Sequence, residues 1–252
     1  MVLPAEEAGR LITSSSRVLV ATAVPAERDA VAEAFAGDTG RVRLPGVSLV
    51  RVAGGFDLLA TGVGPAAAAA STATALTAAA LEGAPYGLVV CAGIGGGFAP
   101  GAPLGTLVVS AAITAADLGA ETADGFLPVT DLGFGHITHR PPEPLVSEAV
   151  RVTGARPGTV LTVSTVTGTA GRAAALRARH PDALAEGMEG FGVAEAAVAQ
   201  GRPVLEVRAV SNPVGPRDRA AWRIGDALSA LTEGFGKLAP VLESWIQHDH
   251  HP

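Results

Sequence analysis

The chain has 252 residues, of which 48% are hydrophobic and 17% charged, and this balance excludes a disordered protein and suits one α/β domain with a filled core. The formal net charge of -6 argues against a groove that tracks nucleic-acid phosphates. The single cysteine, Cys91, excludes an intrachain disulfide, and its apolar neighbours indicate a small core residue rather than a nucleophile.

The ends of the chain carry no targeting signal that the sequence reveals. Glu6 and Glu7 interrupt the N-terminal segment, and no apolar run is long enough to cross a bilayer as a helix. We therefore expect a cytoplasmic protein with an N-terminal extension over residues 1–16, a single domain over 17–247 and a tail over 248–252. The tail holds His248-Asp249-His250-His251, which we expect to bind metal ions only adventitiously.

Strand and helix signals alternate along the chain. In order, they predict a strand at 18–21, a helix at 26–35, a hairpin of strands 47–52 and 56–60 about Gly54-Gly55, a helix at 65–80, strands at 86–91 and 106–113, a long loop at 117–142, a strand at 160–166, helices at 170–179 and 189–200, a strand at 204–210 and a closing helix at 222–247. Buried strands joined by helices predict a layered α/β fold with a largely parallel or mixed sheet.

Ligands of such sheets bind beyond the carboxyl ends of the strands. Polar or glycine-rich segments follow several predicted strands, namely Glu27, Gly62–Gly64, Gly93–Gly97, Thr165–Thr169, Glu189 and Ser211-Asn212. The Gly93–Gly97 segment predicts a tight turn, but Phe98 at the third glycine position excludes a dinucleotide fingerprint, and no Walker lysine follows. By itself this turn fits a structural role as well as a binding site.

Three polar residues each allow a chemical and a structural interpretation. Glu27 is placed to act as a general base on water, or simply to favour the first turn of a helix. Glu189 is placed to accept hydrogen bonds from a sugar diol, or to be a solvated acid at a helix N-terminus. Asn212 offers a donor and an acceptor to the edge of a base, or forms an ordinary turn with Ser211 and Pro213.

The order and spacing of these segments resemble the nucleoside phosphorylase and nucleosidase family, in particular its methylthioadenosine/S-adenosylhomocysteine nucleosidase branch, over roughly residues 17–245. The resemblance implies a nucleoside phosphorylase-like fold, three-layer α/β/α with a central mixed sheet, and a glutamate, Glu27, that activates water. It further implies that Gly95 and Gly96 lie on the ribosyl side and that Met188 and Glu189 bind the ribose hydroxyls.

Asn212 departs from the family pattern, in which a Ser-Asp pair serves the purine where this chain has Ser211-Asn212. An asparagine can donate to O6 and accept from a protonated N7, so we expect a 6-oxopurine. Residues 117–126 and 207–219 also resemble one subgroup, whose substrate is a hypoxanthine nucleoside with an aromatic carboxylate on the 5′ side. This implies that the backbone of Thr167, Gly168 and Thr169 lines the purine and that an arginine binds the carboxylate. The candidates are Arg217, Arg219 and Arg140.

The resemblance leaves other activities open. A phosphorylase would need cationic groups near Gly93–Gly97, a segment that is apolar in sequence, and a binding protein would hold a nucleoside without releasing its base. An adenine-specific nucleosidase is a further alternative. We expect a small-molecule nucleoside as partner, no nucleic acid or membrane, and a homo-oligomer. We expect neither a cofactor nor a metal, because His136 and His139 lie in the predicted loop with no third ligand in view.

Overall fold

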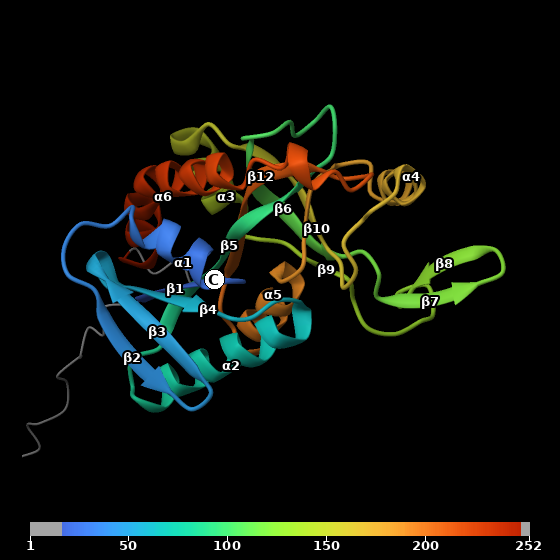
Figure 1. Cartoon of the computed structure of the whole chain (residues 1–252). Helices are drawn as coiled ribbons and strands as arrows, with labels where there is room; N and C mark the ends of the chain where they lie inside the picture. The colour runs from blue at the N-terminus through green and yellow to red at the C-terminus, as the bar shows by residue number, and fades with distance from the viewer. Residues whose placement is uncertain (1–16, 248–252) are drawn as a thin grey trace, which may run out of the picture.

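The computed structural model describes residues 17–247, so the predicted extension over 1–16 and the tail over 248–252 lie outside the described residues (Figure 1). The strands are β1 (Arg17–Thr22), β2 (Gly40–Leu44), β3 (Val47–Val52), β4 (Phe56–Ala60), β5 (Tyr86–Gly97), β6 (Leu107–Ala115), β7 (Gly119–Thr122), β8 (Gly125–Pro128), β9 (Thr138–His139), β10 (Arg156–Thr162), β11 (Ala183–Gly187) and β12 (Val204–Pro213). The helices are α1 (Pro25–Ala32), α2 (Pro65–Leu81), α3 (Glu143–Thr153), α4 (Ala170–Arg179), α5 (Gly190–Ala199) and α6 (Ile224–Gln247), with 3-10 turns at Ala53–Gly55 and Arg219–Ala221.

Two helical layers cover the two faces of the main sheet. Side chains of β1 alternate between them: Val18 and Val20 join one core cluster, and Leu19 and Ala21 join the other. The first cluster lies beneath α1, α3 and α6, and the second beneath α2 and α5 (Figure 1). The predicted three-layer α/β/α architecture with a mixed sheet is therefore confirmed.

The main sheet has the strand order β11-β10-β6-β12-β5-β1-β4-β3-β2, with β9 paired to β6. Strand β11 also pairs antiparallel with the end of β5, where Ala185 faces Gly97 and Glu186 faces Gly96. The path from β5 through β12, β6, β10 and β11 thus returns to β5 and closes a ring of strands. The ring brings the carboxyl end of β11 against β5, although the two strands run in opposite directions.

The predicted glycine turn at 93–97 is wrong, because this segment is the second half of β5. Its backbone pairs with β12 on one side and, at its end, with β11 on the other. The reason is steric. A Cβ at Gly95 would lie 2.6 Å from the carbonyl oxygen of Glu186, and one at Gly97 would lie 2.1 Å from that of Ala102. Glycine at these positions lets β11 and the loop at Ala102 approach β5 closely, and it is not needed for a turn.

Other predicted boundaries also need correction. The long loop at 117–142 contains β9 and the β7–β8 hairpin, which projects from the body of the molecule (Figure 1). The strand predicted at 160–166 begins earlier and ends at Thr162. Helix α3 and strand β2 were not predicted. In the sequence, Pro142 and Pro144 indicate a loop. In the structure they flank Glu143, the first residue of α3, and proline is tolerated there because N–H groups in the first turn of a helix have no partner within the helix.

The alanine-rich helix α2 packs against α5 rather than against lipid. Within residues 17–247, no helix is long and apolar enough to cross a membrane. A Cβ added to Gly192 of α5 would lie 2.1 Å from the carbonyl oxygen of Pro65, in the first turn of α2. The two helices therefore approach closely because α5 has a glycine at that position.

Replacing Gly192 with alanine is expected to destabilise the protein by about 1–3 kcal/mol, since the added methyl group must push two helix backbones apart. The matched control is Gly171→Ala in α4, where a Cβ would meet nothing within 4 Å. Chemical denaturation measures both free energies of unfolding. Equal stability of the two variants would contradict the close packing of α2 on α5.

Candidate active site

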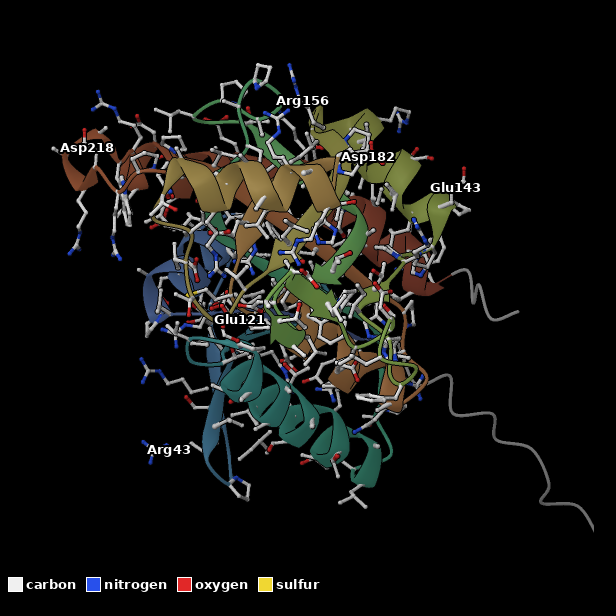
Figure 2. The ribbon with its side chains drawn as sticks, turned by 90° about the vertical axis from the view of Figure 1, so that its right-hand side faces the viewer. Arg43, Glu121, Glu143, Arg156, Asp182 and Asp218 are labelled. Carbon is white, nitrogen blue, oxygen red and sulfur yellow. The ribbon has the colours of Figure 1, made fainter. Side chains whose placement is uncertain are left out.

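The centre of the candidate site is the guanidinium of Arg208, which projects from β12 and is 1% exposed. Its Nε donates to Glu206 Oε1 at 2.8 Å, and its Nη2 donates to Glu189 Oε2 at 3.1 Å. Its Nη1 donates to the carbonyl of Ile94 in β5 at 3.2 Å. An arginine keeps its charge inside a protein, so this cation is fixed and is neutralised by carboxylates. By contrast, Arg43, Glu143 and Asp218 lie on the outside of the molecule (Figure 2).

Glu27 lies in the first turn of α1, directly after β1, and its carboxylate is buried. Oε2 accepts from the N–H groups of Ala23 and Val24 at 2.9 and 3.2 Å, and Oε1 accepts from the N–H of Ile94 at 2.9 Å. Burial raises the pKa of this carboxyl above its ordinary value, while Arg208 and the N–H groups act in the opposite direction. The predicted carboxylate after the first strand is thus held rigidly beside β5.

Glu189 is the N-cap residue of α5, directly after the carboxyl end of β11. Oε1 accepts from the N–H of Gly64 at 3.2 Å, which ties β11 to the start of α2. Oε2 accepts from Arg208 and, at 3.3 Å, from the N–H of Met188. Two of the predicted site segments, at 62–64 and 188–189, therefore meet at this carboxylate.

Glycines make room for the buried charges. A Cβ at Gly93 would lie 2.6 Å from Glu27 Oε1 and 2.8 Å from Arg208 Nη1. At Gly187 a Cβ would lie 2.8 Å from Arg208 Cζ, and at Gly190 it would lie 2.1 Å from Glu206 Oε2. Each of these distances is too short for a carbon atom. The glycines on β5, β11 and α5 are therefore required by the position of the charges.

Ser211 and Asn212 end β12 on the other side of the glycine segment. The Ser211 hydroxyl is placed to donate to Asn212 Oδ1 at 2.9 Å and to the carbonyl of Gly95 at 3.3 Å. Asn212 Nδ2 donates to the carbonyl of Pro213 at 3.1 Å. Because an amide has two donor hydrogens and two acceptor lone pairs, Asn212 keeps one donor and one acceptor for a further partner. A Cβ at Gly96 would lie 3.3 Å from Nδ2, so the amide faces Gly96.

The segment after β10 is fixed through Glu186 of β11. Thr167 donates to this carboxylate with its N–H at 2.9 Å and with its hydroxyl at 2.5 Å. Gly168 and Thr169 are exposed, and the Thr169 hydroxyl caps α4 by accepting from the N–H of Arg172 at 3.2 Å. Because Glu186 also pairs with Gly96, the segment 167–169 lies beside the glycine half of β5.

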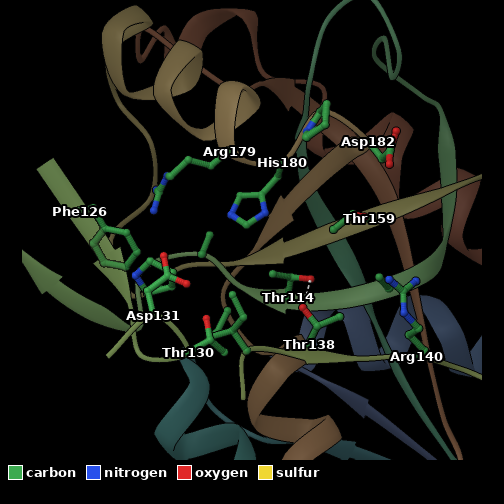
Figure 3. Close-up of a pocket in the computed structure, with 16 residues that line it drawn as sticks. Thr114, Phe126, Thr130, Asp131, Thr138, Arg140, Thr159, Arg179, His180 and Asp182 are labelled. Carbon is green, nitrogen blue, oxygen red and sulfur yellow. Dashed lines mark hydrogen bonds between the residues drawn. The ribbon is translucent and has the colours of Figure 1, made fainter. Parts of the chain in front are cut away.

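Within residues 17–247, no hydrogen bond or ion pair joins the candidate arginines to this cluster. The guanidinium groups of Arg217 and Arg219 lie 5.4 and 5.7 Å from the ring centroid of Trp222. Arg140 lines a separate cavity of about 620 Å³, into which Phe126 and Arg179 also project (Figure 3). None of Glu27, Glu189 and Asn212 lines that cavity.

Arg208, Glu206 and Glu186 were not predicted as site residues. The available signal was a pair of charges, Glu206 and Arg208, inside a strand that is otherwise apolar and expected to be fully buried. A buried charge needs a partner, so such a pair indicates a network. Cys91 is buried, as predicted, with its Sγ 3.4 Å from Arg208 Nη2, and burial raises the pKa of its thiol well above the ordinary value.

The family model described as the phosphorylase superfamily matches residues 18–243 of this chain. Solved structures share the fold. Futalosine hydrolase of Helicobacter pylori, in a mutant form, superposes with a TM-score of 0.77 at 16% identity, covering 89% of this chain and 99% of that one. A methylthioadenosine/S-adenosylhomocysteine nucleosidase of Colwellia psychrerythraea in complex with adenine superposes with a TM-score of 0.74 at 21% identity, covering 92% of this chain and 96% of that one.

Closer sequence relatives are futalosine hydrolases. The chain is 75% identical to that of Streptomyces coelicolor over 92% of this chain and 99% of the relative. It is 45% identical to the futalosine hydrolase of Acidothermus cellulolyticus over 89% of this chain and 91% of the relative. The chain therefore belongs to the phosphorylase superfamily and, within it, to the futalosine hydrolase family. The resemblance stated from the sequence is confirmed.

Two glutamates are expected to titrate on opposite sides of the ordinary value of 4.5. Burial raises the pKa of Glu27, so it should take up its proton above 4.5 as the pH falls. The hydrogen bond from Arg151 lowers the pKa of exposed Glu148, which should protonate below 4.5. NMR titration of ¹³C-labelled glutamate, assigned with Glu27→Gln and Glu148→Gln, measures both. A Glu27 midpoint at or below that of Glu148 would contradict the account of its burial.

Proposed function

We propose that this protein hydrolyses the N-glycosidic bond of futalosine and releases hypoxanthine and dehypoxanthine futalosine, as a step of the alternative menaquinone route. The observation that carries the proposal is the buried Glu27 carboxylate, held by three N–H groups in one network with Glu189. The names of the sequence relatives support the substrate. We further propose a cytoplasmic, homo-oligomeric enzyme whose single nucleosidase domain spans residues 17–247.

In the proposed reaction Glu27 acts on water. Cleavage develops positive charge on the anomeric carbon and negative charge on the leaving purine, and water must lose a proton as it attacks. The carboxylate is a suitable base because burial raises its pKa toward the working pH. Three fixed N–H donors hold it in one orientation, so little reorganisation is needed at the moment of reaction.

We assign the ribose hydroxyls to Glu189, with Met188 beside it. A carboxylate offers about four lone-pair sites, and the contacts with Gly64, Met188 and Arg208 leave room for an incoming hydroxyl. We also assign Gly95 and Gly96 to the sugar side, as the family resemblance implies, with the backbone of Glu186 packed against Gly95 and Asn212 against Gly96. Charged acceptors make hydrogen bonds worth about 1.5–3 kcal/mol each, so this contact would contribute strongly to ribose recognition.

We assign the purine to Asn212, with Ser211 orienting its amide and the segment Thr167–Thr169 beside it. The remaining hydrogen on Nδ2 suits O6 of hypoxanthine, and the remaining lone pair on Oδ1 suits a protonated N7. Asn212 cannot itself supply that proton, which must come from solvent or a neighbour. For the 5′-side carboxylate we propose Arg217, which is exposed on the segment that follows Asn212, with Arg219 and Arg140 as the alternatives.

The site supports a hydrolase better than a phosphorylase. A cation does lie against the glycine segment, which the apolar sequence there did not predict, but Arg208 already donates to Glu189, Glu206 and Ile94. The N–H of Ile94 is likewise taken by Glu27. Three carboxylates around one guanidinium repel phosphate rather than bind it.

The test is to incubate the protein with futalosine, inosine or methylthioadenosine, with and without phosphate, and to follow free base. We expect hypoxanthine from futalosine at a rate that phosphate does not change. Adenine released from methylthioadenosine with equal kcat/KM would indicate the adenine-specific alternative. A requirement for phosphate would indicate a phosphorylase, and binding without release of base would indicate a binding protein.

The matched variants for this assay are Glu27→Gln and Glu148→Gln. Loss of the general base should lower kcat by about 10²–10⁴-fold, whereas the exposed Glu148 should leave it unchanged. Because the ionised carboxylate is the active form, wild-type activity should be lost as the pH falls through the raised pKa of Glu27. A Glu27→Gln enzyme as fast as the wild type would remove this residue from the mechanism.

The Asn212→Asp variant is expected to shift the preference from a 6-oxopurine toward a 6-aminopurine. With asparagine at this position, adenine leaves one buried polar group without a hydrogen-bond partner whichever way the amide is turned. Such an unmatched group costs about 1–3 kcal/mol, which corresponds to a kcat/KM roughly 5- to 150-fold lower for the 6-aminopurine. A protonated aspartic acid serves N7, and its second oxygen accepts from the amino group. The readout is the ratio of kcat/KM for 6-oxo and 6-amino nucleosides with the same 5′ group. A wild-type ratio near one would refute this role.

A further inference from the structure

Three metal-ligating atoms converge on one point outside the candidate active site. His136 Nε2 and His139 Nε2 lie 2.7 and 2.9 Å from the same oxygen, Oε1 of Glu195, and 3.2 Å from each other. The two histidines come from the segment around β9, and Glu195 comes from α5. The sequence left the histidine pair without a third ligand because Glu195 lies 56 positions beyond His139 along the chain.

The spacing of these atoms matches a tetrahedral metal. Zinc binds imidazole nitrogen at about 2.0–2.1 Å and carboxylate oxygen at about 2.0–2.2 Å, which puts neighbouring ligand atoms about 3.3 Å apart. The observed triangle, with sides of 2.7, 2.9 and 3.2 Å, would have to open by about 0.1 to 0.6 Å a side to reach that spacing. An ion between the three atoms would use a lone pair from each of them.

Hydrogen bonding without a metal leaves a repulsive contact in either protonation state of the two histidines. If both Nε2 atoms carry hydrogen, Oε1 can accept from both, but the two N–H groups then face each other at 3.2 Å. If one nitrogen lacks hydrogen, its lone pair points toward the carboxylate oxygen, and the two repel. A metal ion placed between the three atoms would accept a lone pair from each of them and remove both of these repulsions.

The ligands stand on well-supported elements. His139 is buried, and its strand β9 pairs with β6, with His139 opposite Ile113. Glu195 lies one helical turn after Phe191, whose ring centroid is 5.2 Å from that of His139 and 6.0 Å from that of His136. The side chains of His136 and Glu195 are 57% and 41% exposed, so an ion can enter and water can complete its coordination.

We propose that His136, His139 and Glu195 form a binding site for a divalent transition-metal ion, with Zn²⁺ as the best match to two imidazoles and a carboxylate. The ion would clamp the β9 segment to α5, the helix whose N-cap is Glu189. It is a structural site that takes no part in bond cleavage, and it does not depend on the proposed function.

The test must separate this site from the histidines of the C-terminal tail. All proteins therefore carry His248→Ala, His250→Ala and His251→Ala in the full-length chain. After treatment with a chelator and dialysis, zinc binding is measured by competition with a chromophoric chelator, and Co²⁺ is added separately to record its visible absorption. His136→Ala and Glu195→Gln each remove one exposed ligand, and His180→Ala is the control at a histidine that is not part of the triad.

We expect one zinc per chain, the intense visible bands of four-coordinate Co²⁺, and a rise in Tm on adding zinc. Substitution of a residue beside a metal ligand typically lowers affinity 10–100-fold, so loss of a ligand itself should lower it by at least about 100-fold. His136→Ala and Glu195→Gln should therefore lose both the binding and the rise in Tm, and His180→Ala should keep them. Absence of stoichiometric binding, or binding that the two ligand variants leave unchanged, would overturn the proposal.

Discussion

The structure depends on one buried cation. Arg208 stands in the middle of the sheet, cannot lose its charge, and has no water to solvate it. It is stable there because Glu189 and Glu206 pair with it and the carbonyl of Ile94 accepts from its Nη1. Breaking such a pair from one side typically costs about 3–5 kcal/mol, because the other charge is left buried and alone. The carboxylates therefore have to arrive from β11 and β12 at fixed positions, and the closed ring of strands is what brings them there.

The same constraint explains the glycines. In sequence, Gly93–Gly97 has the appearance of an anion-binding turn, and chemistry of that kind would need free N–H groups. The N–H of Ile94 instead donates to Glu27. The space that a Cβ would occupy at Gly93, Gly187 or Gly190 is filled by atoms of the charged cluster. The glycine content of this region thus follows from the packing of charges and not from the conformation of a loop. At its other end the segment is faced by the amide of Asn212, beside Gly96.

The sequence predicts best those features that local chemistry decides. Helices α2 and α4 match closely, since Pro65 suits the first turn of one helix and Thr169 caps the other. Glu27, Glu189 and Asn212 were found because they follow strands in the order of a known family, although their roles stay proposals. Arg208 and Glu206 were missed because their meaning lies in partners from other strands. Glu195 was missed as a partner of His136 and His139 for the same reason. The β7–β8 hairpin has only short strands, and these gave no clear periodic signal.

The charge balance around Arg208 also bears on the choice between water and phosphate as nucleophile. A general base gains strength as its pKa rises, but it must remain ionised at the working pH. Burial pushes the pKa of Glu27 up, and Arg208 with the three N–H donors limits the rise. Were the guanidinium free, it would attract an anion to the glycine segment. Held between Glu189 and Glu206, it opposes the rise in the pKa of Glu27 while its own charge is already paired. In the proposed mechanism, one buried arginine would favour hydrolysis in two ways, by helping the base to stay ionised and by leaving the competing nucleophile no cation to bind.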